Sequence, residues 1–425
     1  MTNNFVFKNK DLTYFKIVVF LLAYFTLYFS LYLGEDSTGG AILDYENQRN
    51  VIGEFVKDFR FALLNYDTLP YTTRHSPILI SFLAILTKLN LSEFVIKLFY
   101  IHVNLLLPIF FYKSLKIKFK NVDTNYLFLL SILIFLSPTF RTLIIWPDSR
   151  ILGVTLFTIS IFHFLKFVDN NKFKHALYNI IFYAFSAYIS PNFSLFSTFF
   201  IYYYFRKYGF TSNYFFKILI INVILSLPAI YYVFILDINF FFAKATVSLP
   251  GEDKLFVNFF NQLLIIPTIL FFYLFPFILI NSLNLDLRGN FIIKFTISLI
   301  ISIISINFFD YKIDFTGGGI FFHFSHLILN NNIIFYLISI ISIYFIICIF
   351  FNDFKNILLL IIIFLGNPQT TIYHKYYDPI LIILFFTLII VNLNLRKIIE
   401  KNSIIILYIY FSFFLAISNF KHLLN

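Results

Sequence analysis

GEDSTGGAILDYENQRNVIGEFVKDFRFALLNYDTLPYTTRHSP, residues 34–77, is a long polar stretch between two hydrophobic segments. It holds seven acidic residues in a chain that is 60% hydrophobic and has a mean hydropathy of +0.85. Carboxylates are costly inside a bilayer, so such a chain keeps most of them outside it. We therefore predict that residues 34–93 form the first extracytoplasmic loop of a membrane protein.

The composition of the whole chain excludes a soluble fold. Only 12% of the 425 residues are charged, and 22% are aromatic. A water-facing surface needs far more polar residues than this. The net charge of +11 would favour nucleic acid as a partner of a soluble protein, but the positive-inside rule explains it in a membrane protein. We predict an all-α polytopic membrane protein with no nucleic-acid partner.

The orientation of the chain follows from its basic residues. Lys8, Lys10 and Lys16 precede the first hydrophobic segment, 17–33, which places the N-terminus in the cytoplasm and residue 34 outside. The apolar run that follows Pro77 is too short to cross a bilayer. If it crossed, the basic cluster at 113–120 would lie outside, so we predict a helix at 78–89 that lies at the outer interface.

The remaining hydrophobic segments give about 13 transmembrane helices in one membrane domain, residues 1–425. Further outer loops are expected at 310–332 and 366–378. Function usually resides in loops held by a rigid scaffold, so these loops and the first one are the places to look for a site. The predicted spans are 17–33, 94–112, 125–138, 151–167, 176–190, 193–205, 214–236, 256–281, 291–309, 333–351, 357–372, 379–392 and 403–418.

Asp44 follows the first span by about ten residues, and Glu46 comes two residues later. A carboxylate near a membrane surface can act as a general base on a hydroxyl, or hold a divalent cation that neutralises a phosphate. The other loop acids, such as Glu35 and Asp58, are better explained as solvated side chains.

Five features in order resemble the GT-C class of polytopic glycosyltransferases, which use polyprenyl-phosphate-linked sugars. The resemblance covers about the first 170 residues well and about the last fifty loosely, and it is closest to the lipid A aminoarabinose transferase and protein mannosyltransferase type. The features are Asp44 in LDYEN, the amphipathic segment 47–64, Arg74-His75-Ser76-Pro77 opening a short apolar helix, Pro138, Arg141 and Asp148 in SPTFRTLIIWPDSRILGVTLF, and Tyr373-His374-Lys375-Tyr376-Tyr377-Asp378-Pro379 before a late span.

The resemblance implies a GT-C-like bundle with juxtamembrane helices in its first loop, and a role for each motif. Asp44 would be the catalytic base. Mg²⁺ or Mn²⁺, which prefer oxygen ligands, would be held by Asp44, Glu46 and Asp148. Asp148 is equally well explained as an N-cap of the following span. The residues that would bind the phosphate or the sugar are Arg74, His75, Arg141, Arg150, His374, Lys375 and Tyr376.

The implied function is transfer of a sugar from a polyprenyl-phosphate donor to a periplasm-facing acceptor, either a lipid-linked or an envelope glycan. The enzyme would be inverting and multi-pass in the bacterial inner membrane, with its active site on the periplasmic side and membrane lipids around it. Two alternatives stay open. An O-antigen or polysaccharide polymerase also has many spans and large outer loops, and a lipid-linked glycan flippase or transporter would place ionisable residues at mid-membrane.

Overall fold

The computed structural model describes residues 9–71, 73–240, 259–280, 290–313, 317–367, 371–391, 397–398 and 401–424. Every regular element in these ranges is a helix, which confirms the all-α prediction. The elements are α1 (Asn9–Leu33), α2 (Ala41–Lys57), α3 (Phe59–Leu64), α4 (Pro77–Lys88), α5 (Glu93–Asn104), α6 (Leu106–Lys118), α7 (Thr124–Ile132), η1 (Leu133–Leu136), α8 (Pro138–Ile145), α9 (Ser149–Asn170), α10 (Phe173–Ile189), η2 (Pro191–Leu195), α11 (Phe196–Tyr208), α12 (Asn213–Ile230), η3 (Tyr231–Ile235), α13 (Phe259–Leu279), α14 (Phe291–Asn307), α15 (Ile320–Leu329), α16 (Ile333–Phe350), α17 (Phe354–Leu365), η5 (His374–Tyr376), α18 (Ile380–Thr387) and α20 (Lys401–Leu424).

Seven helices in the described ranges are long and apolar enough to cross a bilayer, which supports a multi-pass membrane protein. An eighth span is formed if α7–η1 and α8 are counted together, although the chain bends by 65° between them. Each of the 13 predicted spans contains a helix, but α10, α11, α14, α17 and α18 are shorter than these seven. The structure therefore supports the polytopic fold without confirming the number of crossings.

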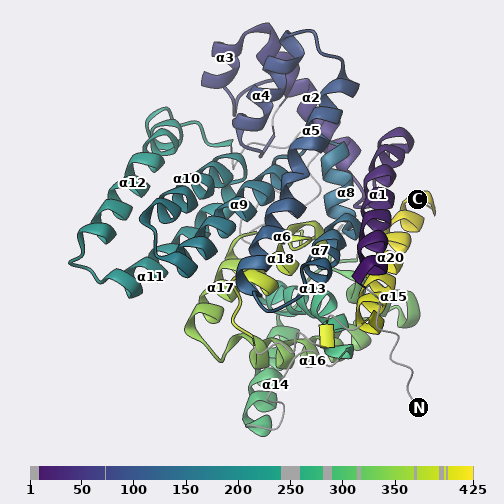
Figure 1. The fold of residues 1–425 in the computed structure, drawn as a ribbon. Helices are drawn as coiled ribbons and strands as arrows, with labels where there is room; N and C mark the ends of the chain where they lie inside the picture. The colour runs from purple at the N-terminus through teal and green to yellow at the C-terminus, as the bar shows by residue number, and fades with distance from the viewer. Residues whose placement is uncertain are drawn as a thin grey trace.

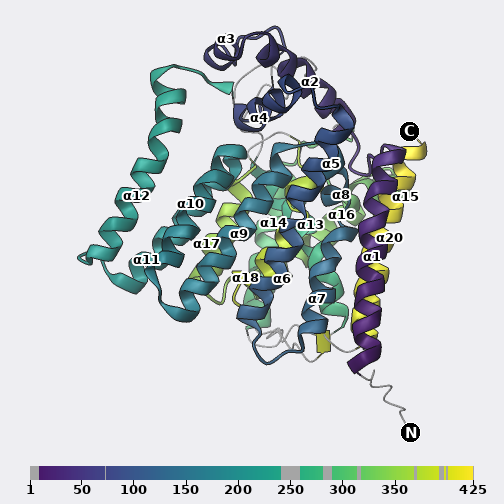
Figure 2. The ribbon, with the colours of Figure 1, turned by 45° about the horizontal axis from the view of Figure 1, so that its top comes forward.

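Helices α2, α3 and α4 form a cap at one end of the bundle (Figures 1 and 2). Side-chain caps fix where they begin. The Asp36 carboxylate accepts hydrogen bonds from the backbone N–H groups of Gly40 and Ala41, at 2.8 and 3.1 Å, just where α2 starts. Ser76 caps α4, and Pro77 occupies its first turn, where a missing N–H does no harm. The Ser-Pro pair of the sequence motif is thus a helix start.

Helix α4 matches the interfacial helix predicted at 78–89. Its inner face packs on α2 through buried residues such as Leu79 and Leu83. Its outer face is an exposed apolar stripe that meets the exposed face of α5, where the Phe82 and Phe99 rings lie 6.1 Å apart. The stripe consists of Ile78, Phe82, Ile85 and Leu89. A stripe of this kind is typical of a helix that rests on lipid.

The long helices below the cap place the termini at opposite ends. Helices α1 and α20 lie side by side at one edge, with the N-terminal end of α1 away from the cap (Figure 2). At the other edge, α12 returns to the cap through η3. There the Tyr232 hydroxyl donates to the Leu63 carbonyl at 2.8 Å, and the Asn239 N–H donates to Asp67 at 3.0 Å. These two contacts fasten the middle of the cap, at the end of α3 and in the loop before α4, to the end of the α12–η3 segment.

Candidate functional site

Asp44 lies in the first turn of α2, and its carboxylate faces the loop that contains η5. Its Oδ2 atom is 3.0 Å from Nζ of Lys375, so an ion pair joins residues 331 positions apart in the chain. The Lys375 side chain is 12% exposed, whereas that of Asp44 is 41% exposed. Asp44 therefore contacts a basic residue and stays open to an incoming group.

The electrostatics of this pair favour its charged form. Burial raises the pKa of Asp44, but the nearby charges of Lys375, His75 and Arg150 outweigh burial and hold the pKa below its ordinary value. Burial lowers the pKa of Lys375, but the Asp44 carboxylate outweighs it and raises the pKa. Both groups are charged at neutral pH. Because Asp44 is paired with Lys375, its carboxylate is a weaker base than an unpaired aspartate.

Asp148 and His75 extend this cluster at the start of α9. The Asp148 carboxylate accepts a hydrogen bond of 2.7 Å from the Arg150 N–H, so the N-cap interpretation of this residue is confirmed. Its other oxygen is 3.9 Å from Nε2 of His75, whose Nδ1 is 2.7 Å from the Ser149 hydroxyl. His75 thus lies between the cap loop and α9, and the cluster connects α2, α9 and η5.

Arg150 brings a positive charge to the same place without a carboxylate partner. Its Cζ atom lies 4.5 Å from the centre of the Tyr376 ring, a cation–π contact. Its Nη1 atom is buried and has no hydrogen-bond partner. Within the described residues, Arg150 forms no ion pair with an acidic side chain.

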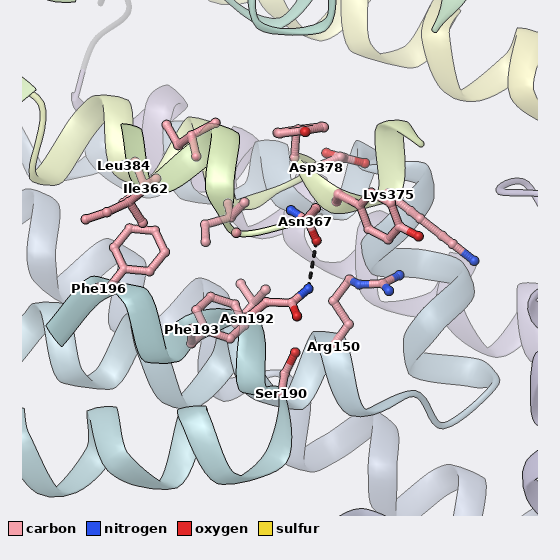
Figure 3. A pocket seen from close by; sticks show the side chains of 16 residues that line it. Arg150, Ser190, Asn192, Phe193, Phe196, Ile362, Asn367, Lys375, Asp378 and Leu384 are labelled. Carbon is pink, nitrogen blue, oxygen red and sulfur yellow. Dashed lines mark hydrogen bonds between the residues drawn. The ribbon is translucent and has the colours of Figure 1, made fainter. Parts of the chain in front are cut away.

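Arg150 and Lys375 stand at one side of a pocket between α9, η2–α11, α17 and the segment from η5 to α18 (Figure 3). Apolar side chains line the opposite side, and an amide pair crosses between them, with Asn192 donating to Asn367 at 2.7 Å. The pocket therefore has a cationic end and an apolar end. Its apolar side is formed by Phe193, Phe196, Ile362 and Leu384.

Several pocket residues were not predicted from the sequence. Ser190, Asn192 and Asn367 line it, as does Asp378. A Pro or Gly beside each asparagine, in SPN and GNP, is a turn signal that can be read without coordinates. The Asp378 carboxylate accepts hydrogen bonds from the Ser137 hydroxyl at 2.5 Å and the Thr139 N–H at 3.2 Å, and burial raises its pKa to about 6. Asp378 thereby fastens the η5 segment to the start of α8.

A glycine loop holds the η5 segment from the other side. The Gly318 N–H donates to the Ile372 carbonyl at 2.9 Å, and the Ile320 N–H donates to Nε2 of His374 at 3.1 Å. Gly317, Gly318 and Gly319 all have positive φ, and a Cβ at Gly317 would lie 2.7 Å from the Ile372 oxygen. Only glycine fits such a close approach. His374 is thus turned toward α15 and Tyr273 rather than toward Asp44.

Arg141, predicted as a phosphate ligand, is engaged elsewhere. Its Nε and Nη2 atoms contact the Glu35 carboxylate at 2.9–3.1 Å, and its Nη1 donates to the Thr26 hydroxyl at 3.0 Å. Nη2 also donates to Ser30. The Glu35–Arg141 pair is buried, with side chains 8% and 9% exposed. All three guanidinium nitrogens form hydrogen bonds that join α8 to the end of α1. Arg141 therefore has a structural role.

The remaining predicted site residues are Glu46 and Arg74. Glu46 is exposed, and Arg74 is half-buried in the loop before His75. In the described part of the chain, no group of three or more His, Cys, Asp or Glu residues could hold a metal ion. Asp44, Glu46 and Asp148 therefore do not form one ligand set there, and binding of Mg²⁺ or Mn²⁺ stays a prediction.

Comparison with protein-family models, with curated proteins and with solved structures finds no match to this chain.

Proposed function

We propose that the protein is an inverting glycosyltransferase that moves one sugar from a polyprenyl phosphate to a hydroxyl group of a lipid-linked or envelope glycan. The observation that carries the proposal is Arg150, which lines the pocket and whose buried Nη1 atom has no hydrogen-bond partner in the described part of the chain. A buried N–H group without an acceptor costs about 1–3 kcal/mol, and a bound anion would relieve this cost. Lys375 adds a second cation at the same end.

The residues that line the pocket favour an anion carried on a lipid. Its cationic end continues into an apolar side formed by α11, α17 and α18, which are hydrophobic helices of a membrane protein. A free sugar phosphate has no group that would fill the apolar side. A polyprenyl phosphate has both parts, because its phosphate suits Arg150 and Lys375 and its chain suits the apolar residues.

The reaction uses the ion-paired carboxylate and the cations together. The acceptor hydroxyl oxygen attacks the anomeric carbon of the donor sugar while Asp44 takes the hydroxyl proton. The bond between the anomeric carbon and the phosphate oxygen breaks, and its electron pair leaves with the polyprenyl phosphate. Arg150 and Lys375 stabilise the negative charge that grows on this oxygen. Attack from the opposite face inverts the anomeric carbon.

The proposed orientation puts this site on the periplasmic side of the bacterial inner membrane. The cap lies at the end of the bundle away from the N-terminal end of α1 (Figure 2), and the basic residues that flank this end of α1 favour the cytoplasm. Lys375 is paired with Asp44 on helix α2 of the cap. Nucleotide sugars are cytoplasmic, so a catalytic surface on the other side needs a donor delivered by the membrane. A polyprenyl-phosphate sugar is such a donor.

The test measures release of polyprenyl phosphate from a panel of polyprenyl-phosphate hexoses and pentoses, with envelope glycolipids as acceptors, in proteoliposomes that contain the full chain. Asp44→Asn should lower transfer by about 100-fold or more, the usual contribution of a general base. Glu54→Gln is the matched control, because Glu54 is an acid on the same helix that pairs with the exposed Lys57, and its loss should leave the rate unchanged.

Three outcomes would contradict the proposal. Full activity of Asp44→Asn in correctly inserted protein would remove Asp44 from the chemistry. Movement of the lipid across the bilayer without a new glycosidic bond would favour a flippase. Repeated extension of one glycan chain would favour a polymerase.

A further inference from the structure

We propose that the ends of α6, α9 and α10 away from the cap bind the phosphate headgroup of an anionic phospholipid, with His163, Lys166 and His175 at the centre of the site. This inference does not depend on the proposed function. The three helices pack side by side, α6 on α9 and α9 on α10 (Figure 2). Helix α9 begins beside the cap, where Ser149 contacts His75, so its last turns lie at the opposite end of the bundle.

A continuous series of aromatic and basic side chains crosses these helices. The Lys113 ammonium of α6 lies 4.6 Å from the centre of the Phe110 ring, and this ring meets the Phe162 ring of α9 with the centres 5.2 Å apart. The Lys166 ammonium lies 5.4 Å from the centre of the Phe162 ring, and the His163 ring lies 5.0 Å from it. Two lysines and an imidazole are therefore gathered around one pair of rings.

Two histidines face each other where α9 meets α10. Nδ1 of His163 is 3.2 Å from Nδ1 of His175, and the rings are stacked with their centres 5.5 Å apart. When both rings are neutral, one Nδ1–H donates to the other Nδ1, so the accepting ring carries its proton on Nε2. Both histidines are half-buried, and Tyr178 beside them is 44% exposed, so the pair reaches the surface. An anion there would accept a hydrogen bond from the Nε2–H group.

The positive charges around this pair are not neutralised by acidic residues. Within the described residues, Lys166, Lys172 and Lys174 form no ion pair, and Asp169 at the end of α9 is already paired with a lysine of the α6–α7 loop. Burial lowers the pKa of His175, and the charges of these three lysines lower it further, so they lie close to its ring. A bound anion would offset the repulsion among these cations.

The surroundings favour a lipid as the source of the anion. His163 lies about two turns, roughly 10 Å, before the end of α9, a helix long and apolar enough to cross a bilayer. The Phe182 ring is stacked on His163 with the centres 5.7 Å apart, and Phe185, 53% exposed, continues the apolar surface along α10. Free phosphate stays in water, whereas a phospholipid brings its phosphate to this depth and places its acyl chains against such a surface. Basic pockets between transmembrane helices bind anionic headgroups in this way.

The experiment measures lipid binding to the full chain in detergent micelles by native mass spectrometry. The probes are phosphatidylglycerol, which is anionic, and phosphatidylcholine, which has no net charge. Phosphatidylglycerol should bind about tenfold or more tightly, because each lysine beside an anionic lipid contributes about fivefold. Lys166→Gln should therefore weaken its binding about fivefold, and Lys166→Arg, which keeps the charge, should bind it like wild type. His163→Phe keeps the ring stack but removes the imidazole, and should also weaken binding.

The matched control is Lys16→Gln, which removes the same charge from the same end of the bundle but on α1, at the other edge (Figure 2). It should change binding by less than about twofold. Equal binding of the two lipids, or equal losses in Lys16→Gln and Lys166→Gln, would overturn the inference, because the charges would then act without a site. Displacement of phosphatidylglycerol by excess inorganic phosphate would overturn the assignment to a lipid. If Lys166→Gln does not fold, Lys174→Gln at an exposed residue provides the same test.

Discussion

Arg141 in α8 and Arg150 in α9 should affect the stability of the protein differently when each is replaced by methionine. Arg141→Met leaves the Glu35 carboxylate buried and unpaired. Glu35 and Arg141 have side chains only 8% and 9% exposed, and three N···O contacts of 2.9–3.1 Å join them. Removing one partner of such a pair costs about 3–5 kcal/mol. Replacing both, as in Glu35→Met with Arg141→Met, should recover much of this loss, because no charge is then left alone.

Arg150→Met removes a half-buried cation that forms no ion pair with a carboxylate of the described chain. Its free energy of unfolding should therefore stay the same or rise slightly, despite the lost contact with Tyr376. Its affinity for a polyprenyl phosphate should fall, because a hydrogen bond to a charged group contributes about 1.5–3 kcal/mol, roughly 10- to 150-fold in Kd. One arginine thus maintains the fold, and the other maintains binding.

The assay uses the single tryptophan of the chain. The Trp146 indole donates to the Glu35 carbonyl at 2.9 Å, so its fluorescence reports the region around the buried pair. Unfolding of each variant in detergent micelles is followed by this signal, and lipid binding is measured separately. Equal stability of wild type and Arg141→Met, or a loss in Arg150→Met as large as in Arg141→Met, would refute the reasoning.

The pH dependence of stability, through Asp378, and a substitution at Gly317 supply two further tests of how the η5 segment is held. The unfolded chain releases the Asp378 proton near pH 4 and the folded chain near pH 6, so the contribution of Asp378 to stability should fall by about 3 kcal/mol as the pH rises through this window. The lowered pKa values of Glu35 and Asp44 act in the opposite direction, so the measurement is the difference in stability between wild type and Asp378→Asn, and a difference that stays constant over the window would contradict the assignment. Gly317→Ala should destabilise the protein by about 1–3 kcal/mol and lower transfer, because its φ is +97° and its Cβ would press on Ile372. Gly53→Ala, in open space on α2, should instead stabilise by about 1 kcal/mol in the same unfolding assay, and equal effects of the two changes would be inconsistent with a strained loop.

Local signals in the sequence predicted the elements that bear the site. The short apolar run after Pro77 predicted a helix at 78–89, and α4 spans Pro77–Lys88, while its place at the outer interface stays a prediction. The N-cap interpretation of Asp148 needed only its position before a hydrophobic segment. Helix lengths were harder to predict, because a hydrophobic run does not reveal a bend such as the one between α7–η1 and α8.

Pairings between distant segments could not be read from the sequence. Nothing local indicates that Lys375 pairs with Asp44, or that Glu35 pairs with Arg141. Arg141 and Arg150 look equivalent as interfacial arginines, and only the fold shows that one has a buried carboxylate beside it. Tertiary contacts therefore decided which of the predicted cations are free for a ligand.

The most direct measurement is a cryo-electron microscopy structure of the full chain in nanodiscs with undecaprenyl phosphate. We predict phosphate density within hydrogen-bonding distance of Arg150 and Lys375, with the polyprenyl chain along Phe193, Phe196 and Leu384. Density for the phosphate at another surface, with Arg150 Nη1 still without a partner, would contradict the proposed lipid-phosphate site.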